Sequence, residues 1–291
     1  MRFFNLIRKS VLPISGASSI EVYDGKIFIV GDDSPTLYVT DKSWKREESV
    51  VLMPEKKGRI PKMEKMDLEA TTLIKNPDGS HSLLITGSAS MPGREVVIVA
   101  PIDNLIDFTK YDCSLFFNRL RTLFGLSSIN IEGMTNVENK YLILACRGSQ
   151  KHPQNYLFVV PINFYRKQIS CFIKLVRLNL PKNIGISGLS FWGNNKAMFT
   201  ATVEHSTDSI QDGEIGDSYF GWLNVWPTAN SVTDTLSPAF IANLSKYSRA
   251  FCGEKVESVA IAETQQNRYL LHFVSDNDNG VSHIFEAELN L

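Results

Sequence analysis

The sequence has few cysteines, and none of them stands in a metal-binding pattern. Cys113, Cys146, Cys171 and Cys252 are far apart, with no C-x-x-C pair and no histidine at zinc-site spacing. This excludes the common zinc sites and a framework of closely spaced disulfides. We expect reduced cysteines that are mostly buried.

Long apolar runs are also missing. No run approaches the roughly 18 apolar residues that cross a bilayer, so no membrane span is expected. The apolar stretches within residues 1–15 are shorter than the core of a signal peptide, which has roughly 7–15 residues. We therefore expect a cytoplasmic protein, or a periplasmic one if a signal peptide has been removed.

Neither sign of charge is in excess. The chain has 30 Lys and Arg residues against 31 Asp and Glu, a net charge of -1. Because this balance gives no general attraction to phosphate backbones, we expect no nucleic acid among the partners. The sequence also lacks the P-loop, the G-x-S-x-G elbow and the H-E-x-x-H helix. Any functional site must be built locally from other residues.

What the sequence does contain is a divergent repeat. A short anchor followed by a turn and an apolar strand occurs five times, at Ser15-Gly16-Ala17, Leu68-Glu69-Ala70, Ile131-Glu132-Gly133, Ile186-Ser187-Gly188 and Val256-Glu257-Ser258. The strands are rich in β-branched and aromatic residues, and the repeat length suits four-stranded blades. The sequence predicts an all-β fold, a five-bladed β-propeller.

The expected blade boundaries leave the last blade one strand short and leave one segment at the start of the chain outside any blade. The blades are expected at about 15–53, 67–117, 130–179, 185–244 and 255–291. The last blade has only three strands, and the segment 3–12 precedes the first anchor. We expect this segment to complete the last blade, which closes the ring of a single propeller domain over residues 1–291 and removes an open sheet edge. Two stacked β-sandwich domains are the alternative.

Three anchors carry a glutamate, which the symmetry of a propeller would bring to the central channel. Glu69, Glu132 and Glu257 cannot all stay ionised in a narrow channel without a compensating cation. Oxygen ligands favour Ca²⁺ or Mg²⁺. Carboxylates that only accept structural hydrogen bonds, and carboxylates that contact a substrate, are the alternatives.

Polar residues end the second strand of each repeat and should share one rim of the ring. They predict a ligand-binding channel mouth formed by Asp32, Asp33, Ser88, Arg147, Glu204 and Asp276. The mixed basic stretch between residues 56 and 65 is expected to be an exposed linker between blades.

Several strings also carry a family resemblance, namely Asp67-Leu68-Glu69-Ala70 leading to Gly87-Ser88, Ile131-Glu132-Gly133 leading to Arg147-Gly148, Asp212-Gly213-Glu214, and Ser275-Asp276-Asn277-Asp278. Through them the chain resembles a group of bacterial β-propellers common in Bacteroidetes, and more distantly the SdiA-regulated and phytase-like propellers. The resemblance spans essentially the whole chain. It implies a propeller with a metal in or near the channel, and it implies no particular reaction.

Two functions follow from these observations. The favoured hypothesis is a propeller that binds a small polar ligand or a protein partner at an acidic, cation-binding channel. The alternative is a metal-dependent hydrolase, phosphoesterase-like or lactonase-like, in which Glu69, Glu132, Glu204 and Glu257 serve as metal ligands or general bases. The sequence offers acids for the second role without identifying the base.

Overall fold

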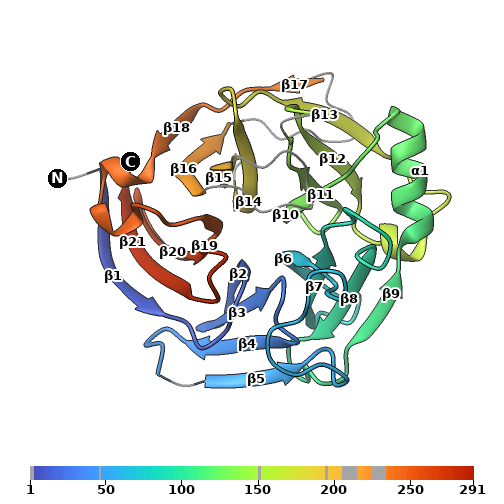
Figure 1. Ribbon diagram of the computed structural model, residues 1–291, viewed down its shortest axis with the longest axis horizontal. Helices are drawn as coiled ribbons and strands as arrows, with labels where there is room; N and C mark the ends of the chain where they lie inside the picture. The colour runs from blue at the N-terminus through green and yellow to red at the C-terminus, as the bar shows by residue number, and fades with distance from the viewer. Residues whose placement is uncertain (1–2, 46, 150–151, 194–195, 205–214, 225–233) are drawn as a thin grey trace.

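Five antiparallel sheets surround a central axis as the blades of a propeller (Figure 1). The computed structural model describes residues 3–45, 47–149, 152–193, 196–204, 215–224 and 234–291. The sequence-based prediction of a five-bladed propeller with four-stranded blades is confirmed. None of the helices in these ranges is long and apolar enough to cross a membrane.

Each blade starts at the axis and steps outward. The strands of blade 1 are β2 (Ala17–Tyr23), β3 (Lys26–Gly31), β4 (Thr36–Asp41) and β5 (Glu47–Val51). Those of blade 2 are β6 (Leu68–Lys75), β7 (His81–Gly87), β8 (Val96–Pro101) and β9 (Thr109–Asp112). Those of blade 3 are β10 (Ile131–Val137), β11 (Tyr141–Cys146), β12 (Asn155–Pro161) and β13 (Lys174–Leu178). Those of blade 4 are β14 (Ile184–Gly193), β15 (Lys196–Glu204), β16 (Ile215–Leu223) and β18 (Phe240–Asn243).

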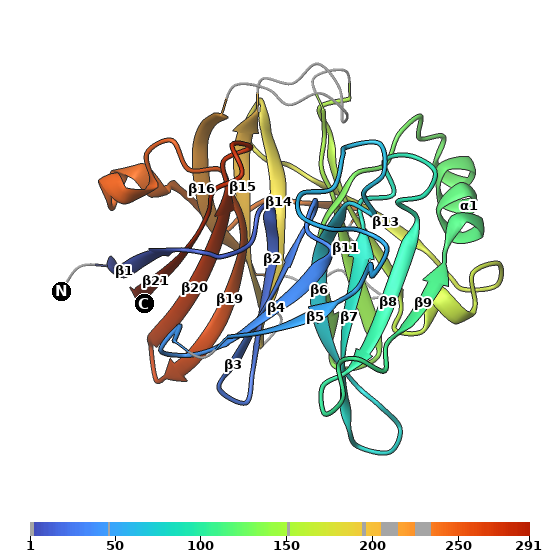
Figure 2. The same cartoon turned by 60° about the horizontal axis from the view of Figure 1, so that its bottom comes forward.

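Blade 5 joins the two ends of the chain, as the sequence predicts. Its strands are β19 (Val256–Gln265), β20 (Arg268–Asp276), β21 (Ser282–Asn290) and β1 (Phe4–Val11). β1 pairs antiparallel with β21, with Phe4 opposite Leu289 and Val11 opposite His283. Both termini therefore lie beside this blade in Figures 1 and 2. The pairing covers the edge of β21 that would otherwise be open to another chain.

Little of the described chain is helical. α1 (Ser114–Phe124) lies outside the ring between blades 2 and 3 (Figure 1). Three short 3-10 helices cover Phe164–Arg166, Leu244–Lys246 and Arg249–Phe251. A short fifth strand, β17 (Thr235–Leu236), adds to blade 3 parallel to β13. Residues 102–107, between β8 and β9, form turns.

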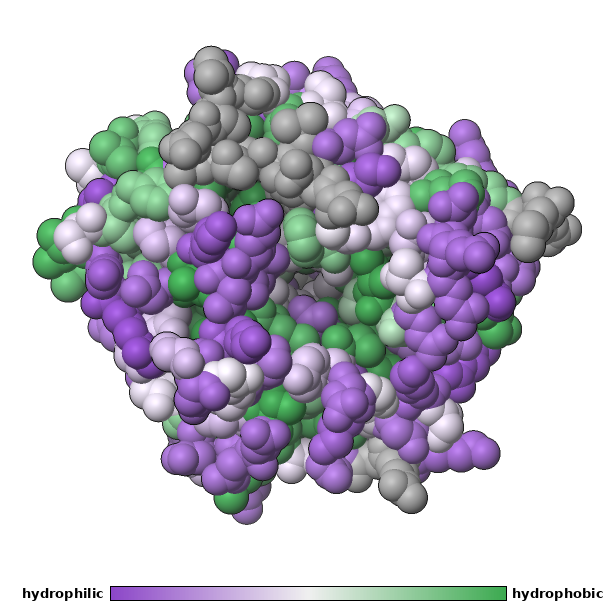
Figure 3. Space-filling model, turned by 180° about the vertical axis from the view of Figure 1, so that it is seen from behind, coloured by the Kyte–Doolittle hydropathy of each residue, from purple (hydrophilic) through white to green (hydrophobic). Residues whose placement is uncertain are grey.

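The hydrophobic core is divided into five clusters, one between each pair of neighbouring blades. The cluster between blades 2 and 3 also buries Phe116, Phe117 and Leu120 of α1. Polar groups lie around the edges of the disc, and the face turned away from the viewer in Figure 1 is hollowed at its centre (Figure 3). Apolar side chains therefore fill the spaces between neighbouring blades.

A β-bulge recurs at the same place in all five innermost strands. The register of each inner hairpin skips one residue, and the skipped residues are Ser18, Glu69, Glu132, Ser187 and Glu257. A bulge redirects the extra side chain away from the regular pleat. Four of these positions are the predicted anchors, and the first is a correction: Ser18, not Ser15, is the equivalent residue in blade 1.

The small residue after each bulge lets neighbouring blades approach closely. A Cβ atom at Gly188 would lie 2.6 Å from the carbonyl oxygen of Glu257 in the next blade. At Gly133 it would lie 2.9 Å from the backbone nitrogen of Leu189. The Gly, Ala or Ser of the repeat is therefore a packing requirement, while the residue before it is free to carry chemistry.

Candidate functional site

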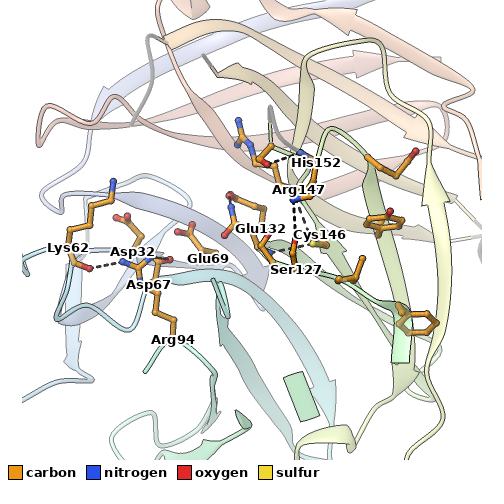
Figure 4. A pocket seen from close by; sticks show the side chains of 18 of the residues that line it. Asp32, Lys62, Asp67, Glu69, Arg94, Ser127, Glu132, Cys146, Arg147 and His152 are labelled. Carbon is orange, nitrogen blue, oxygen red and sulfur yellow. Dashed lines mark hydrogen bonds and ion pairs between the residues drawn. The ribbon is translucent and has the colours of Figure 1, made fainter. Parts of the chain in front are cut away.

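A cavity of about 280 Å³ lies at the end of the channel that carries the bulges. Strands and loops of blades 1, 2, 3 and 5 contribute to its wall (Figure 4). Its acidic lining residues are Asp32, Asp67, Glu69, Glu132 and Asp278, and its basic ones are Lys62, Lys65, Arg94, Arg147 and Lys255. The cavity is thus rich in both charges, as a site for a polar ligand requires.

One wall of the cavity is a buried ion-pair network centred on Asp67. Lys65 Nζ lies 2.8 Å from Asp67 Oδ1, and Arg94 Nη1 donates to Asp67 Oδ2 at 2.6 Å. Lys65 also donates to Asp32 Oδ2, and Ser88 Oγ donates to Asp67. These contacts fix three segments that are distant in the sequence: the end of β3, the residues before β6 and the loop before β8.

The network sets the protonation of its members. Burial alone would lower the pKa of Lys65, but the nearby carboxylates of Asp32, Asp67 and Glu69 raise it above its usual value. Burial alone would raise the pKa of Asp67, whereas Lys65 and Arg94 lower it. Lys65 and Asp67 are therefore both charged at neutral pH.

Glu69 and Glu132 stand on adjacent inner strands and face the cavity together (Figure 4). Asn130 Nδ2 donates to Glu132 Oε1 at 2.5 Å. Glu69 accepts no hydrogen bond from any residue that the structure describes. Burial, followed by the negative charges of Glu132, Asp67 and Asp32, raises the pKa of Glu69 well above its usual value. Such a carboxyl group is suited to holding a proton or facing a cation.

Asp276 of blade 5 and Asp32 of blade 1 occupy equivalent positions, because each follows the residue that pairs with the start of its inner strand. Asp276 is 5% exposed, and its Oδ1 atom has no hydrogen-bond partner. Burial and then the charges of Asp32 and Asp278 raise its pKa to about 8. Asp32 Oδ1 is likewise buried without a partner, and burial raises the pKa of Asp32.

The opposite side of the cavity belongs to blade 3 and is basic and partly aromatic. Arg147 Nη2 donates to Thr202 Oγ1 of blade 4 at 2.7 Å. Ser127 Oγ and His152 Nε2 are 2.9 Å apart. Phe124, Leu126 and Tyr156 supply the apolar part of this wall. A ligand that fills the cavity would therefore contact charged side chains and also the apolar wall formed by Phe124, Leu126 and Tyr156.

The structure brings most of the predicted site residues to one end of the channel. Asp32, Glu69, Glu132 and Arg147 line the cavity, and Glu257 forms an ion pair of 3.1 Å with Lys255 beside it. Ser88 is buried against Asp67. Asp33 lines a second, shallower pocket with Arg59, to which it is paired.

Glu204 differs from the expectation for blade 4. Thr202 occupies the place in β15 that corresponds to Arg147 of blade 3, and its hydroxyl binds Arg147. Glu204 lies two residues further along, at the end of β15, and its side chain is outside what the structure describes. In blade 4 the pairing begins two residues before Ile186, at Ile184, and β15 extends correspondingly to Glu204.

Carboxylates that could hold a metal ion come together at Asp32, Asp67 and Glu69. Their nearest oxygens all lie within 4.8 Å of one another. Glu69 belongs to the predicted metal set, and Glu132 and Glu257 are outside this group. The Lys65 ammonium already bridges Asp32 and Asp67. A metal ion bound by all three carboxylates would have to displace it.

The sequence reasoning missed Lys65 and Asp67 as site residues. The interpretation of residues 56–65 as an exposed linker is wrong for Lys65, whose side chain is 10% exposed. Its pairing with Asp32 depends on a tertiary contact between blades 1 and 2. The alternation of Lys65, Asp67 and Glu69 directly before and within β6 is the one pattern that pointed to it.

Fold and site together define a five-bladed β-propeller with a charged cavity at one end of its channel. The chain belongs to a family of unknown function, DUF6929, whose model matches residues 13–289. No curated protein matches the sequence.

The chain is similar, at low sequence identity, to two solved structures. The glutaminyl cyclase of Myxococcus xanthus is 12% identical, with a TM-score of 0.53 over 99% of this chain and 96% of that one. A protein of unknown function from Dyadobacter fermentans DSM 18053 is 9% identical, with a TM-score of 0.49 and full coverage of both chains. At these identities the likeness to the cyclase concerns the fold alone.

Proposed function

We propose that the protein binds a small polar ligand in the cavity at the end of its channel. The observation that carries this proposal is the wall of the cavity, where charged side chains from four blades face a volume of about 280 Å³. The apolar patch of Phe124, Leu126 and Tyr156 gives such a ligand a desolvated surface.

The rigidity of the wall supports binding. Asp67 is held at once by Lys65, Arg94 and Ser88, so little side-chain entropy remains to be lost when a ligand enters. Arg147 is likewise fixed by Thr202 and packs closely on Gly185, where a Cβ atom would lie 2.6 Å from Arg147 Nε. Sites that are ordered before binding lose less affinity to conformational entropy.

A screen of small polar metabolites by thermal shift tests this function. Each hit is repeated with Glu132→Gln and Arg147→Gln, and with Glu138→Gln as the matched control on an exposed turn of the same blade, where the side chain is 62% exposed. Binding in the cavity predicts that hits stabilise the wild type and the control, and that at least one cavity variant binds about tenfold more weakly. Hits that bind both cavity variants like the wild type would contradict the proposal.

Metal-dependent hydrolysis of a phosphoester or lactone is the second candidate. The grouping of Asp32, Asp67 and Glu69 favours it, since carboxylate oxygens suit Ca²⁺ or Mg²⁺. We also propose that the chain is distantly related to phytase-like propellers, a relationship that would be consistent with metal-dependent hydrolysis. Assays on phosphoester and lactone panels, with and without Ca²⁺, decide the matter: turnover that Glu132→Gln abolishes in a folded protein supports it, and an inert wild type rejects it.

A further inference from the structure

Five equivalent positions surround the end of the channel, and blade 3 fills its position with a cation. Each position follows the residue whose backbone pairing precedes the β-bulge of the inner strand. From blade 1 to blade 5 the residues there are Asp32, Ser88, Arg147, Thr202 and Asp276. Arg147 therefore gives the cavity a positively charged side that the repeat itself does not require.

The fold keeps room for the Arg147 side chain. It crosses from blade 3 onto blade 4, where Nη2 donates to Thr202 Oγ1 at 2.7 Å. A Cβ atom at Gly185 would lie 2.6 Å from Nε and 2.7 Å from Cγ of Arg147. Gly185 is not among the glycines with a positive φ, so space for Arg147 accounts for this glycine better than backbone geometry does. A guanidinium held in place binds a planar carboxylate or a phosphate through two parallel hydrogen bonds.

An apolar surface lies beside this guanidinium. Phe124, Leu126 and Tyr156 line the same cavity and pack against the core between blades 2 and 3. The ring centroids of Phe124 and Tyr156 lie 6.1 Å and 6.3 Å from that of Phe158, which is fully buried. Tyr156 pairs with Cys146, the residue before Arg147. A ligand could therefore place an aromatic ring on this surface while its charged end meets Arg147.

The acidic wall across the cavity opposes an anion less than its composition suggests. Lys65 and Arg94 offset the charges of Asp32 and Asp67. Burial, followed by the charges of neighbouring carboxylates, raises the pKa of Glu69 well above its usual value. Glu69 thus keeps its proton to a higher pH than an exposed glutamate does, and a protonated carboxyl group donates a hydrogen bond to an acceptor oxygen.

We propose that the cavity binds an aromatic oxyanion, whose carboxylate or phosphate group meets Arg147 and whose ring packs on Phe124, Leu126 and Tyr156. This inference rests on the proposed ligand-binding function and names the chemical class of the ligand. The cavity volume is about 280 Å³. Small-molecule sites start at roughly 300 Å³, so the cavity suits one ring with one charged group.

Carboxylates and phosphates share this recognition by arginine, and the experiment separates them. Benzoate and phenyl phosphate are the two probes. Acetate and inorganic phosphate lack the ring, and benzyl alcohol lacks the charge. Isothermal titration of the full chain is carried out at pH 7.5 and constant ionic strength. At least one probe is expected to bind about tenfold more tightly than its counterpart without a ring and than benzyl alcohol. The probe that binds identifies the charged group.

Variants locate the bound probe. Arg147→Gln removes the positive charge, whereas Gly185→Ala keeps every charge and places a Cβ atom where the Arg147 side chain lies. Each is expected to weaken binding by about tenfold. Glu132→Gln removes a negative charge from the same cavity and is expected to strengthen binding. The matched control is Arg249→Gln, at an exposed arginine in the 3-10 helix Arg249–Phe251, which is expected to bind like the wild type.

Three outcomes overturn the inference. Neither probe binds more tightly than acetate, inorganic phosphate and benzyl alcohol, or Arg147→Gln and Gly185→Ala both bind the probe like the wild type, or Glu132→Gln weakens binding as strongly as Arg147→Gln. The last result would place the probe on the acid instead of the arginine. A far-ultraviolet circular dichroism spectrum establishes that each variant is folded, and Gly185→Ala tests the position of Arg147 even if Arg147→Gln does not fold.

Failure of the inference is distinguishable from failure of the proposed function. A metabolite that loses affinity in Glu132→Gln and keeps it in Arg147→Gln would sustain the ligand site and remove the oxyanion from it. Binding of benzoate or phenyl phosphate that depends on Arg147, with no metabolite hit, would do the reverse.

Discussion

Lys65 Nζ lies 2.8 Å from Asp67 Oδ1, at the point where the chain enters the innermost strand of blade 2. The ammonium group also binds Asp32 of blade 1, so one lysine neutralises carboxylates from two blades. Its side chain is 10% exposed and that of Asp67 is 6% exposed. Lys65 therefore acts as a cation that the chain itself supplies to the acidic end of the channel.

Replacing Lys65 with methionine keeps the length of the side chain and removes this charge. Asp32 and Asp67 would then be buried with less compensation, and breaking a buried ion pair from one side costs about 3–5 kcal/mol. We expect Lys65→Met to lower the free energy of unfolding by about 3 kcal/mol at pH 7.5 in urea titrations. The loss should shrink toward pH 4, where the carboxyl groups become protonated.

Lys140→Met is the control, because the Lys140 side chain is 68% exposed and its ion pair with Glu138 spans 3.6 Å. Exposed pairs contribute about 0–1 kcal/mol. If the two lysine variants lost equal stability, Lys65 would have no special role in compensating the buried acids.

Glu21 of β2 gives the protein a separate dependence on pH. Burial raises the pKa of Glu21 to about 7, although the backbone N–H of Val22 donates to Oε1 at 3.0 Å. The folded state then holds a proton that the unfolded state releases near pH 4.5, so stability falls as the pH rises from about 4.5 to about 7. Glu21→Gln removes this dependence and is expected to stabilise the protein at pH 8 by about 2 kcal/mol.

Urea titrations at pH 5 and pH 8 measure the effect, with Glu48→Gln in the exposed part of β5 as the control. The benefit of Glu21→Gln should be larger at pH 8 than at pH 5. An equal benefit at both values would mean that Glu21 is ionised throughout.

The repeat was visible in the sequence because a bulge imposes local requirements. The residue after Glu132 is Gly133, where a Cβ atom would lie 2.9 Å from the backbone of the next blade, and Ala70 and Ser258 hold the same place after Glu69 and Glu257. These constraints act within each blade, so they recur along the chain. Blade 1 escaped correct alignment because Ser18 is itself small and Ser15-Gly16-Ala17 imitates the pattern.

The ion pairs at the site could not be predicted from the sequence. Lys65 resembles the other basic residues of its segment, and only the arrangement of blades 1 and 2 decides that it is the one buried against Asp32 and Asp67. Arg94 likewise reaches Asp67 across a blade. Local patterns indicate which residues reach the channel, whereas tertiary geometry decides which of them neutralise one another.

Closure of the ring depends on Phe4 in the first strand. Its side chain is 2% exposed, and its ring centroid lies 6.0 Å from that of Phe220 in blade 4 and 6.0 Å from that of Phe273 in blade 5. Phe4→Ala is expected to cost about 3–5 kcal/mol in unfolding free energy. Ile7→Ala on the same strand, where Ile7 is 47% exposed, should cost about 0.5 kcal/mol or less. Similar losses in both variants would contradict a closing role for Phe4.

The four cysteines should differ sharply in their reaction with a thiol reagent. Cys252 is exposed, whereas Cys113, Cys146 and Cys171 are buried. Burial raises the pKa of Cys113 and of Cys146 to about 12, so at pH 8 their reactive thiolates are scarce. We expect one fast equivalent with dithiobisnitrobenzoate in the native protein, none in Cys252→Ser, and four in urea.

Cys146 makes this experiment informative about the site, because it lines the cavity beside Arg147. Cys146 is 3% exposed, and its Sγ atom accepts a hydrogen bond from the backbone N–H of Asn130 at 3.4 Å. A second fast equivalent that disappears in Cys146→Ser would show that the cavity opens enough in solution to admit an aromatic reagent. A slow Cys146 would instead match a cavity of fixed size, into which only a small ligand enters.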